Sequence, residues 1–468
     1  MVHYFSQQGL DILLDVNSGL VHVVDKIVIK IIEKINQDIE VGKLSASCPE
    51  IDVSIKDEIL AKNPKINEEE LIEAIDEVKE LIANNALYTK DVYENAHSFI
   101  ANKEPVLKAM CLSVAHDCNL ACKYCFAEGG EYKGKRELMS FEVGKKALDY
   151  LVKSSKDRRN LEVDFFGGEP LMNIDVVKQL VAYGRSLEKE HNKNFRFTLT
   201  TNAMLLNDEI TDFLNQEMSN VVLSLDGRKE VNDAMRVTRS GAGSYDIIVP
   251  KIKAFIEKRG DKDYYVRGTF TKNNLDFSND IQEYLDLGFE NLSIEPVVTT
   301  ADYGIKEEDI PQILDEYEKL TDLYIKRHDE GKPFTFFHFM IDLDEGPCII
   351  KRLKGCGSGD EYVAVSPSGE IYPCHQFVGM KDFVIGHVDE GITNKEIPLK
   401  FKESCVYTKD KCDKCFAKFY CSGGCPANSY NFCKDINKVY EIGCKMQQKR
   451  VECAIAIKAH LAERGQDE

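Results

Sequence analysis

The chain has 468 residues, of which 43% are hydrophobic and 30% charged, and this composition is typical of a globular protein with roughly two to four domains. Its 60 basic and 79 acidic residues give a net charge of −19, which argues against a nucleic-acid-binding surface, since such surfaces need clustered lysine and arginine. No apolar run reaches the roughly 18 residues of a membrane span, and residues 1–9 lack a secretory pattern. We therefore expect a cytoplasmic protein without membrane contact, whose 16 cysteines are metal ligands or catalytic thiols rather than disulfides.

Residues 1–90 predict a small N-terminal module. Apolar runs within residues 12–24 flank a Val-Asn-Ser-Gly turn at 16–19, which predicts a β-hairpin. Residues 26–36 and 68–84 carry apolar side chains at helical spacing. A hairpin followed by helices is the outline of a winged-helix-like module, although an accessory packing domain would show the same pattern.

Residues 105–335 alternate between strand and helix patterns six times. The expected strands are 109–115, 161–166, 195–200, 221–225, 264–270 and 292–295, and the expected helices are 141–154, 174–192, 208–217, 245–258, 278–287 and 307–328. Six βα units predict a parallel sheet with helices outside it, in an α/β fold that suits a partial (β/α)6 barrel better than the closed eight-fold one. Residues 340–468 are rich in Gly, Pro and Cys up to a final helix at 445–462, which predicts an irregular domain held together by metal clusters.

Three cysteines lie directly after the first expected barrel strand. Cys118, Cys122 and Cys125 have the spacing C-x3-C-x2-C. Three thiolates this close can bind three irons of a 4Fe–4S cluster, which ordinarily takes four cysteines, and the fourth iron is then open to a small chelator. A zinc site would need a further ligand, for which His116 is the candidate, and three structural cysteines are another alternative.

This motif resembles that of the radical SAM enzymes, over roughly residues 108–298. In that family the open iron binds S-adenosylmethionine, and an electron from the cluster generates a 5′-deoxyadenosyl radical that abstracts hydrogen from the substrate. The resemblance implies that Tyr124 lies beside the adenine and that Gly167, Gly168 and Glu169 form the GGE motif, which contacts the methionine ammonium. The other cofactor-binding residues that it implies are Thr201, Asn202, Ser224, Arg236 and Ile294.

Three of these assignments have simpler alternatives. Gly-Gly-Glu-Pro at 167–170 is, taken alone, a common turn sequence, and Arg236 could be a solvated side chain. Asp226, after the fourth expected strand, either faces the substrate as a catalytic residue or caps the following turn.

A second group of cysteines resembles the SPASM domain, which carries two auxiliary 4Fe–4S clusters, so that three clusters are implied in all. By this resemblance the outer auxiliary set is Cys412, Cys415, Cys421 and Cys444, and the inner auxiliary set is Cys356, Cys374 and Cys425. Cys348 could complete the inner set as its fourth ligand. Alternatively, one iron of this cluster stays open and binds a thiolate of the substrate. Two zinc ions in a zinc-ribbon-like domain are the alternative. The remaining cysteines are expected to be free thiols; they are Cys48, Cys111, Cys405, Cys433 and Cys453.

The N-terminal module resembles the peptide-recognition element of maturases of ribosomally made peptides, which binds an extended leader peptide as an added strand. Over nearly the whole chain the resemblance is to the maturases of SCIFF peptides. It implies thioether formation between a peptide cysteine and a carbon of Thr or a similar residue, in which the thiolate is held by an inner auxiliary iron. The implied partners are a Cys-rich precursor peptide, recognised through its leader, and a low-potential electron donor.

Two other functions fit parts of the sequence. An anaerobic sulfatase-maturase-like enzyme would oxidise Cys or Ser to formylglycine, with Asp226 as the base and Cys348 as a cluster ligand. It would leave the N-terminal module unexplained. A non-catalytic iron–sulfur or zinc scaffold is the alternative from a different class, and it predicts no cleavage of S-adenosylmethionine.

Overall fold

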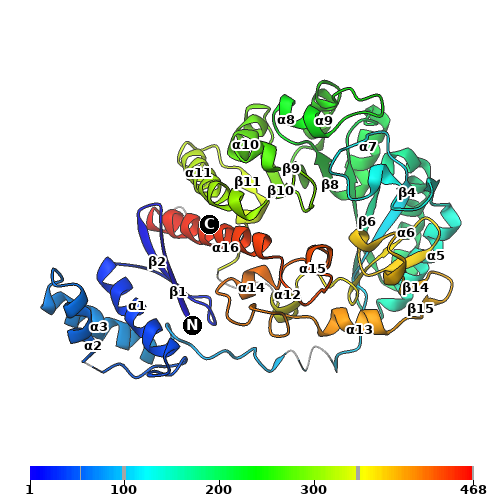
Figure 1. The fold of residues 1–468 in the computed structure, drawn as a ribbon. Helices are drawn as coiled ribbons and strands as arrows, with labels where there is room; N and C mark the ends of the chain where they lie inside the picture. The colour runs from blue at the N-terminus through cyan, green and yellow to red at the C-terminus, as the bar shows by residue number, and fades with distance from the viewer. Residues whose placement is uncertain (53, 97, 99–101, 344–347, 466–468) are drawn as a thin grey trace.

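The computed structural model describes residues 1–52, 54–96, 98, 102–343 and 348–465. Within them a three-stranded sheet lies near the N-terminus and a twelve-stranded sheet forms the body of the molecule (Figure 1). No helix in this part of the chain combines the length and the apolar character that a membrane crossing requires.

The N-terminal module packs three helices against an antiparallel sheet of order β1-β2-β3. Its elements are β1 (Val2–Gln7), β2 (Leu10–Asp15), β3 (Val21–Val24), α1 (Lys26–Glu40), α2 (Ile55–Lys62) and α3 (Glu68–Ala83). Its core contains Leu13, Ile32 and Leu71, each fully buried. The hairpin and the two long helices agree with the expectation, but β1 and α2 are additional. The strand β1 lacks an alternating pattern because it also contacts the C-terminal helix of the chain.

The barrel consists of parallel strands that follow one another in sequence order. The strands are β4 (Ala109–His116), β6 (Asn160–Gly167), β7 (Asn194–Thr201), β8 (Met218–Ser224), β9 (Tyr264–Phe270), β10 (Asn291–Pro296) and the short β11 (Thr335–Phe336). The helices are α5 (Phe141–Ser154), α6 (Ile174–His191), α7 (Asp208–Glu217), α8 (Lys229–Met235), α9 (Tyr245–Arg259), α10 (Phe277–Asp286) and α11 (Ile310–Asp329). The six expected βα units are confirmed. The last helix begins at Ile310 instead of residue 307, because residues 307–309 form a 3-10 turn, and α8 is additional.

The C-terminal region continues the barrel sheet. Strand β12 pairs in parallel with β4, with Val363 opposite Met110. Its elements are β12 (Tyr362–Val365), β13 (Glu370–Tyr372), β14 (Gly386–His387), β15 (Gly391–Ile392), α12 (Ile349–Lys354), α13 (Glu396–Glu403), α14 (Lys418–Cys421), α15 (Pro426–Cys433) and α16 (Glu441–Glu463). A two-residue strand, β5 (Glu137–Leu138), also pairs with β4. Strand β12 thus covers an edge of β4 that would otherwise be open. The C-terminal region is irregular, as expected, but it is joined to the barrel through this pairing.

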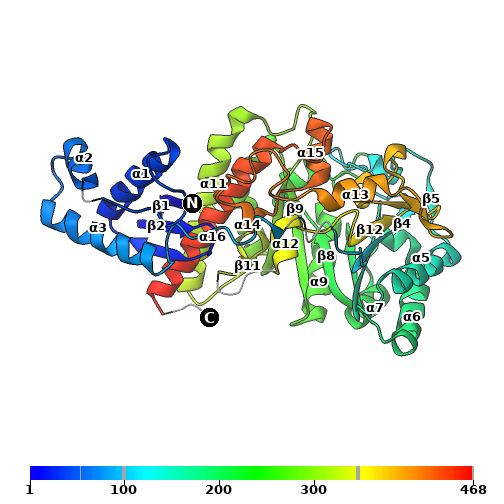
Figure 2. The ribbon, with the colours of Figure 1, turned by 90° about the horizontal axis from the view of Figure 1, so that it is seen from below.

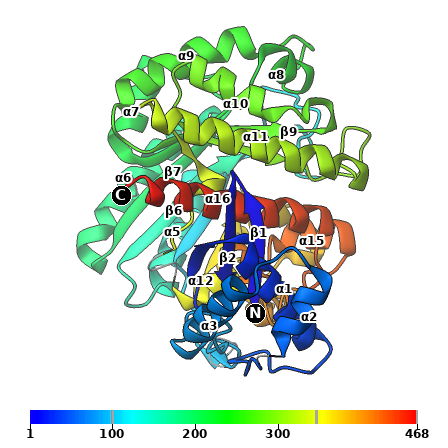
Figure 3. The same ribbon diagram turned by 90° about the vertical axis from the view of Figure 1, so that its left-hand side faces the viewer.

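Helix α16 connects the three parts of the molecule. It passes between the strands of the N-terminal module and α11 of the barrel (Figure 3). Ile455 and Ala456 are buried against Ile12 and Leu14 of β2, and the His3 ring lies 2.9 Å from a Glu452 carboxylate oxygen. The N-terminal module thus forms one end of the molecule, on the side of α16 that faces away from the barrel (Figure 2). The helix is buried nearly all round because it has a partner on each side.

Candidate cofactor and cluster site

The three cysteines of the C-x3-C-x2-C motif lie in the loop that follows β4, at the carboxyl end of the barrel strands. The Cys118 sulfur accepts hydrogen bonds from the Leu120 backbone N–H at 3.4 Å and from the Asn202 side-chain amide at 3.5 Å. Burial raises the pKa of Cys118 to about 12, and the charges of Glu169, Cys122 and Cys125 act in the same direction. Neighbouring thiols that resist deprotonation become thiolates when cationic iron binds them, so this donor set fits a metal cluster.

Glu169 ends the next strand and is fully buried. Its carboxylate accepts hydrogen bonds from the Thr201 hydroxyl at 2.8 Å, the Asn202 backbone N–H at 2.7 Å and the Leu171 backbone N–H at 3.0 Å. Burial raises its pKa to about 7. A buried carboxylate is stabilised by a positively polarised donor, so Glu169 fits a contact with the amino group of the cofactor's methionine.

The two glycines before Glu169 are required by the packing of the backbone. A Cβ atom on Gly167 would lie 2.4 Å from the Ala115 carbonyl oxygen, and one on Gly168 would lie 2.2 Å from that of Asp117. Gly167 also has φ of +137°. The resemblance implies glycines that permit close approach to the cofactor, and in this structure they also let the end of β6 approach the start of the cysteine loop.

Gly168→Ala should therefore displace the cysteine loop. We expect lower iron content, weaker binding of S-adenosylmethionine and a loss of stability of about 1–3 kcal/mol from overpacking. Iron analysis, cofactor titration and thermal unfolding measure these effects. Gly134→Ala is the control, because a Cβ there would meet the Glu131 carbonyl oxygen at 3.4 Å, an ordinary contact. Full iron loading of Gly168→Ala would contradict the packing argument.

Tyr124, Asp226 and Arg236 form a buried polar chain beside the cysteine loop. The Tyr124 hydroxyl donates to an Asp226 carboxylate oxygen at 2.6 Å and accepts from the Arg236 guanidinium at 2.9 Å. The other Asp226 oxygen accepts from the Thr269 backbone N–H at 3.0 Å, so this side chain joins neighbouring strands instead of capping the turn that follows it. Arg236 is 7% exposed and not solvated, and its Nε atom has no hydrogen-bond partner in the described structure. A donor left free in this way fits the carboxylate of a bound cofactor.

The remaining residues that the sequence predicts to bind the cofactor lie at or near the ends of neighbouring strands. Thr201 ends β7 and Asn202 follows it, and the Asn202 amide also donates to the Asn119 side chain at 2.7 Å. Ser224 ends β8 and is half-buried, and Ile294 is fully buried within β10. The structure thus brings the sequence-predicted residues to one end of the barrel. Sequence reasoning does not include Asn119, because its bond to Asn202 spans 83 positions.

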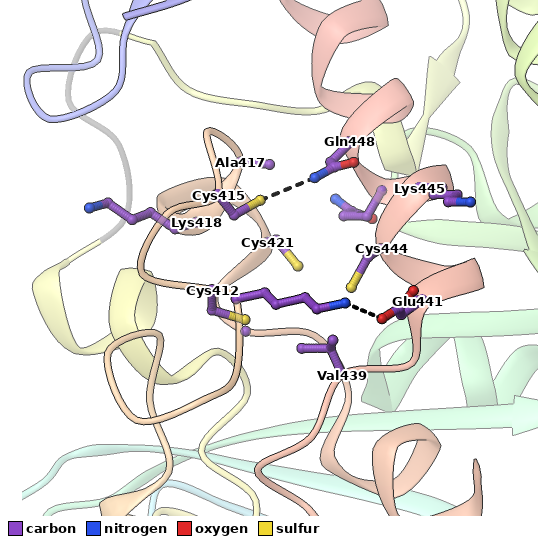
Figure 4. Close-up of a pocket in the computed structure, with 13 residues that line it drawn as sticks. Cys412, Cys415, Ala417, Lys418, Cys421, Val439, Glu441, Cys444, Lys445 and Gln448 are labelled. Atoms are coloured by element: carbon purple, nitrogen blue, oxygen red, sulfur yellow. Dashed lines mark hydrogen bonds and ion pairs between the residues drawn. The ribbon is translucent and has the colours of Figure 1, made fainter. Parts of the chain in front are cut away.

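The outer auxiliary set lines a cavity of about 180 Å³ (Figure 4). Cys412 and Cys415 come from the loop before α14, Cys421 from the end of α14 and Cys444 from α16. The Gln448 amide donates to the Cys415 sulfur at 3.4 Å. Burial raises the pKa of Cys444 to about 12, and the charges of Cys421, Cys412 and Cys415 raise it further. These four thiols therefore lie close enough together to act on one another electrostatically.

The inner auxiliary set is brought together in the same way. Burial raises the pKa of Cys374 well above its usual value, and the charges of Cys425 and Cys356 add to this effect. Cys348 precedes α12 and is exposed, as are Cys356 and Cys425. The 16 cysteines are all free thiols in this structure.

The described residues contain no group of three or more His, Cys, Asp or Glu side chains arranged for a single metal ion. The ligands of a 4Fe–4S cluster lie farther apart than those of one ion, because irons and sulfides separate them. The absence of such a group in the described residues therefore bears on sites for a single metal ion and not on a 4Fe–4S cluster.

Comparisons with known proteins agree with this geometry. A family model described as a 4Fe-4S single cluster domain matches residues 109–249. The cysteine-type anaerobic sulfatase-maturating enzyme of Clostridium novyi is 26% identical over 334 residues, which are 67% of this chain and 86% of that protein. Radical SAM maturases of sulfatases and peptides are thus relatives of this chain.

Two solved structures share the fold. That of anSMEcpe with bound AdoMet has a TM-score of 0.61 and 19% identity, and the match covers 76% of this chain and 99% of that one. That of Streptococcus suis SuiB bound to precursor peptide SuiA has a TM-score of 0.51 and 18% identity, over 93% of this chain and 97% of that one. The chain has the fold of radical SAM enzymes with a SPASM-type C-terminal region, which confirms the resemblance to radical SAM enzymes, while the finer resemblance to SCIFF maturases stays a prediction.

Proposed function

We propose that this chain is a radical SAM maturase that forms cysteine thioether crosslinks in a Cys-rich, SCIFF-type precursor peptide. The observation that carries the proposal is the N-terminal module with its open strand edge. The match to anSMEcpe leaves 24% of this chain without a counterpart, whereas the match to peptide-bound SuiB leaves 7%, too little to omit residues 1–90. A sulfatase-maturase-like activity accounts for the barrel but gives this module no role.

The free edge of β3 supports binding of a leader peptide. In the described structure β3 pairs with β2 on one side, and no strand covers its other side. Leu20, directly before β3, and Val23 within it are 45% and 42% exposed, so two large apolar side chains are available beside this edge. An extended peptide added here would gain main-chain hydrogen bonds and cover both side chains.

Val23→Asp should therefore weaken leader binding. Covering a carboxylate without a partner is unfavourable, so we expect affinity for the precursor to fall about tenfold or more, as measured by fluorescence anisotropy with a labelled peptide. Val41→Asp is the matched control, because Val41 is 68% exposed and lies outside the sheet. Equal affinities of the two variants would place the leader elsewhere. A substitution is preferable to deletion of the module, which would expose the apolar face of α16.

The residues of the chain suggest a division of roles. Cys118, Cys122 and Cys125 would hold the cluster that binds S-adenosylmethionine, while Glu169 and Arg236 would hold the methionine part and Tyr124 would lie beside the adenine. When bound, these groups supply the radical that removes hydrogen from the peptide.

The auxiliary clusters would be held by the two C-terminal sets, giving three clusters in all. We propose that a thiolate of the substrate completes the inner set, with exposed Cys348 as the competing ligand. Asp226 is engaged by Tyr124 and Thr269, which favours a positioning role over that of a free base. A low-potential carrier would supply the electrons.

Mass spectrometry of the product tests the function. The reconstituted enzyme is incubated with S-adenosylmethionine, a reductant and a Cys-rich precursor peptide of the SCIFF type, and in parallel with a Cys-containing sulfatase peptide. A precursor lighter by two hydrogen atoms, with one thiol lost and no aldehyde, supports the thioether. An aldehyde-reactive product from the sulfatase peptide would favour formylglycine formation instead, and absence of 5′-deoxyadenosine would favour the scaffold.

A further inference from the structure

The segment 421–425 connects the two auxiliary cysteine sets. Cys421 at its start belongs to the outer set, and Cys425 at its end belongs to the inner set. Cys421 and Gly423 line the cavity of the outer set and also a neighbouring cavity, which Cys425 lines as well. The two sets therefore lie next to each other with this segment between them, and a charge beside the segment acts on both.

Lys409 places a positive charge beside the middle of this segment. The residue is 5% exposed, and its ammonium donates to the Gly423 carbonyl oxygen at 2.7 Å. Its backbone is held on both sides, because the Lys409 N–H donates to the Cys405 carbonyl oxygen at 3.1 Å and its carbonyl oxygen accepts from the Cys412 N–H at 3.3 Å. The ammonium therefore has a defined position in the fold.

Among the described residues, no carboxylate forms an ion pair with Lys409. In this it differs from Lys418, which is equally buried but lies 2.7 Å from an Asp91 carboxylate oxygen. A buried ammonium whose acceptor is a neutral carbonyl group is unfavourable unless other negative charge is near. The positive charge of Lys409 is therefore left for groups other than carboxylates.

The thiols of both sets supply negative charge around Lys409. Burial lowers the pKa of Lys409, whereas the charges of Cys412, Cys425, Cys421 and Cys356 raise it. Two of these cysteines belong to the outer set and two to the inner set. A cluster held by thiolates gains a negative charge when it is reduced, so a fixed cation nearby stabilises the reduced form relative to the oxidised one.

We propose that Lys409 is a positioning residue whose ammonium is shared by both auxiliary clusters and raises the reduction potential of each. This inference rests on the proposed function, because it presupposes that the two cysteine sets hold clusters. A bond between a thiolate and a carbon radical leaves one electron over, and a cluster with a raised potential accepts that electron more readily. Lys409 would thus favour the completion of the thioether without touching the peptide.

The test is a redox titration followed by electron paramagnetic resonance. The background is the full chain with the three cysteines of the loop after β4 changed to alanine, so that only the auxiliary clusters give a signal. Lys409→Met removes the charge, and Lys409→Arg keeps it. Lys411→Met is the matched control, because Lys411 lies two positions away but its side chain is 70% exposed and paired with Glu441, so that water screens its charge.

In Lys409→Met we expect the equilibrium constant for one-electron reduction of each auxiliary cluster to fall about tenfold, which lowers both potentials by about 59 mV. Lys409→Arg and Lys411→Met should change this constant by less than about twofold. If Lys409→Met does not load iron, Lys409→Gln takes its place, because its amide can still donate a hydrogen bond but carries no charge. Loss of iron in both neutral variants but not in Lys409→Arg would equally support a required charge.

Iron analysis and product mass separate the remaining outcomes. Unchanged potentials at full iron content, a shift in only one cluster or loss of iron in Lys409→Arg would overturn the role of Lys409. Lowered potentials in Lys409→Met together with no thioether in the wild-type product would refute the proposed function and leave this role in place. A background variant without iron would refute the auxiliary clusters and this inference with them.

Discussion

Cys122→Ala is expected to abolish cleavage of S-adenosylmethionine and to leave leader-peptide binding unchanged. Cys122 contributes one of the three thiols in the loop after β4, and the loop offers no further cysteine to replace it. The leader site is assigned to β3, on the other side of α16. Chromatographic assay of 5′-deoxyadenosine in the reduced enzyme and fluorescence anisotropy with the labelled precursor measure the two effects.

The control for this prediction is Cys48→Ala, which removes an exposed thiol of the N-terminal module. It should cleave the cofactor at the wild-type rate. Iron content separates the possible causes in Cys122→Ala, because loss of the barrel cluster alone would leave iron in the proposed auxiliary clusters. Wild-type cofactor cleavage by Cys122→Ala would refute the assignment of this loop as the cluster site.

The architecture of the barrel follows from the sequence because its determinants are local. Strands β6, β7 and β9 bury alternate residues, and the helices between them bury one face, so periodicity separates the two kinds of element. The chemistry-bearing motifs then fall at strand ends, where parallel strands gather their functional residues. The cysteine loop and Glu169 could be assigned to one site for this reason.

Other features depend on contacts between distant parts of the chain. The pairing of β12 with β4 joins residues more than 200 positions apart, and nothing in either segment specifies its partner. The bond between Arg450 and Tyr317 spans 133 positions, and no motif surrounds either residue. Sequence reasoning also assigned the GGE glycines to cofactor access, because the backbone that approaches them at Ala115 and Asp117 is visible only in three dimensions.

Asp91→Ala is expected to destabilise the loop that carries the outer auxiliary set. Lys418 begins α14, directly after this loop and between Cys415 and Cys421. Its side chain is 4% exposed, and its ammonium is 2.7 Å from an Asp91 carboxylate oxygen. The Tyr407 hydroxyl donates to the same carboxylate at 2.8 Å. Removing Asp91 leaves a buried ammonium without its counter-charge, which costs about 3–5 kcal/mol. Thermal unfolding and iron content measure the effect.

The pH dependence of this pair has a definite sign. Burial raises the pKa of Asp91, but the hydrogen bonds from Lys418 and Tyr407 outweigh it and hold that pKa below its usual value of 3.8. A carboxyl group whose pKa is lowered by folding stabilises the protein above its unfolded pKa and loses this effect as the pH falls through the folded value. The difference in stability between wild type and Asp91→Ala should therefore be full at pH 7 and shrink below about pH 4.

A second ion pair of similar length shows why burial decides the size of this effect. Lys178 and Glu209 are 2.6 Å apart, but the Glu209 side chain is 79% exposed. Water and salt screen such a pair, so Glu209→Ala should change stability by no more than about 1 kcal/mol. If Asp91→Ala changes it as little, Lys418 finds compensation elsewhere, and the link between the N-terminal segment and the outer auxiliary loop is not electrostatic. A large loss in Asp91→Ala together with lower iron content would tie the segment that follows the N-terminal module and this cluster set into one folding unit.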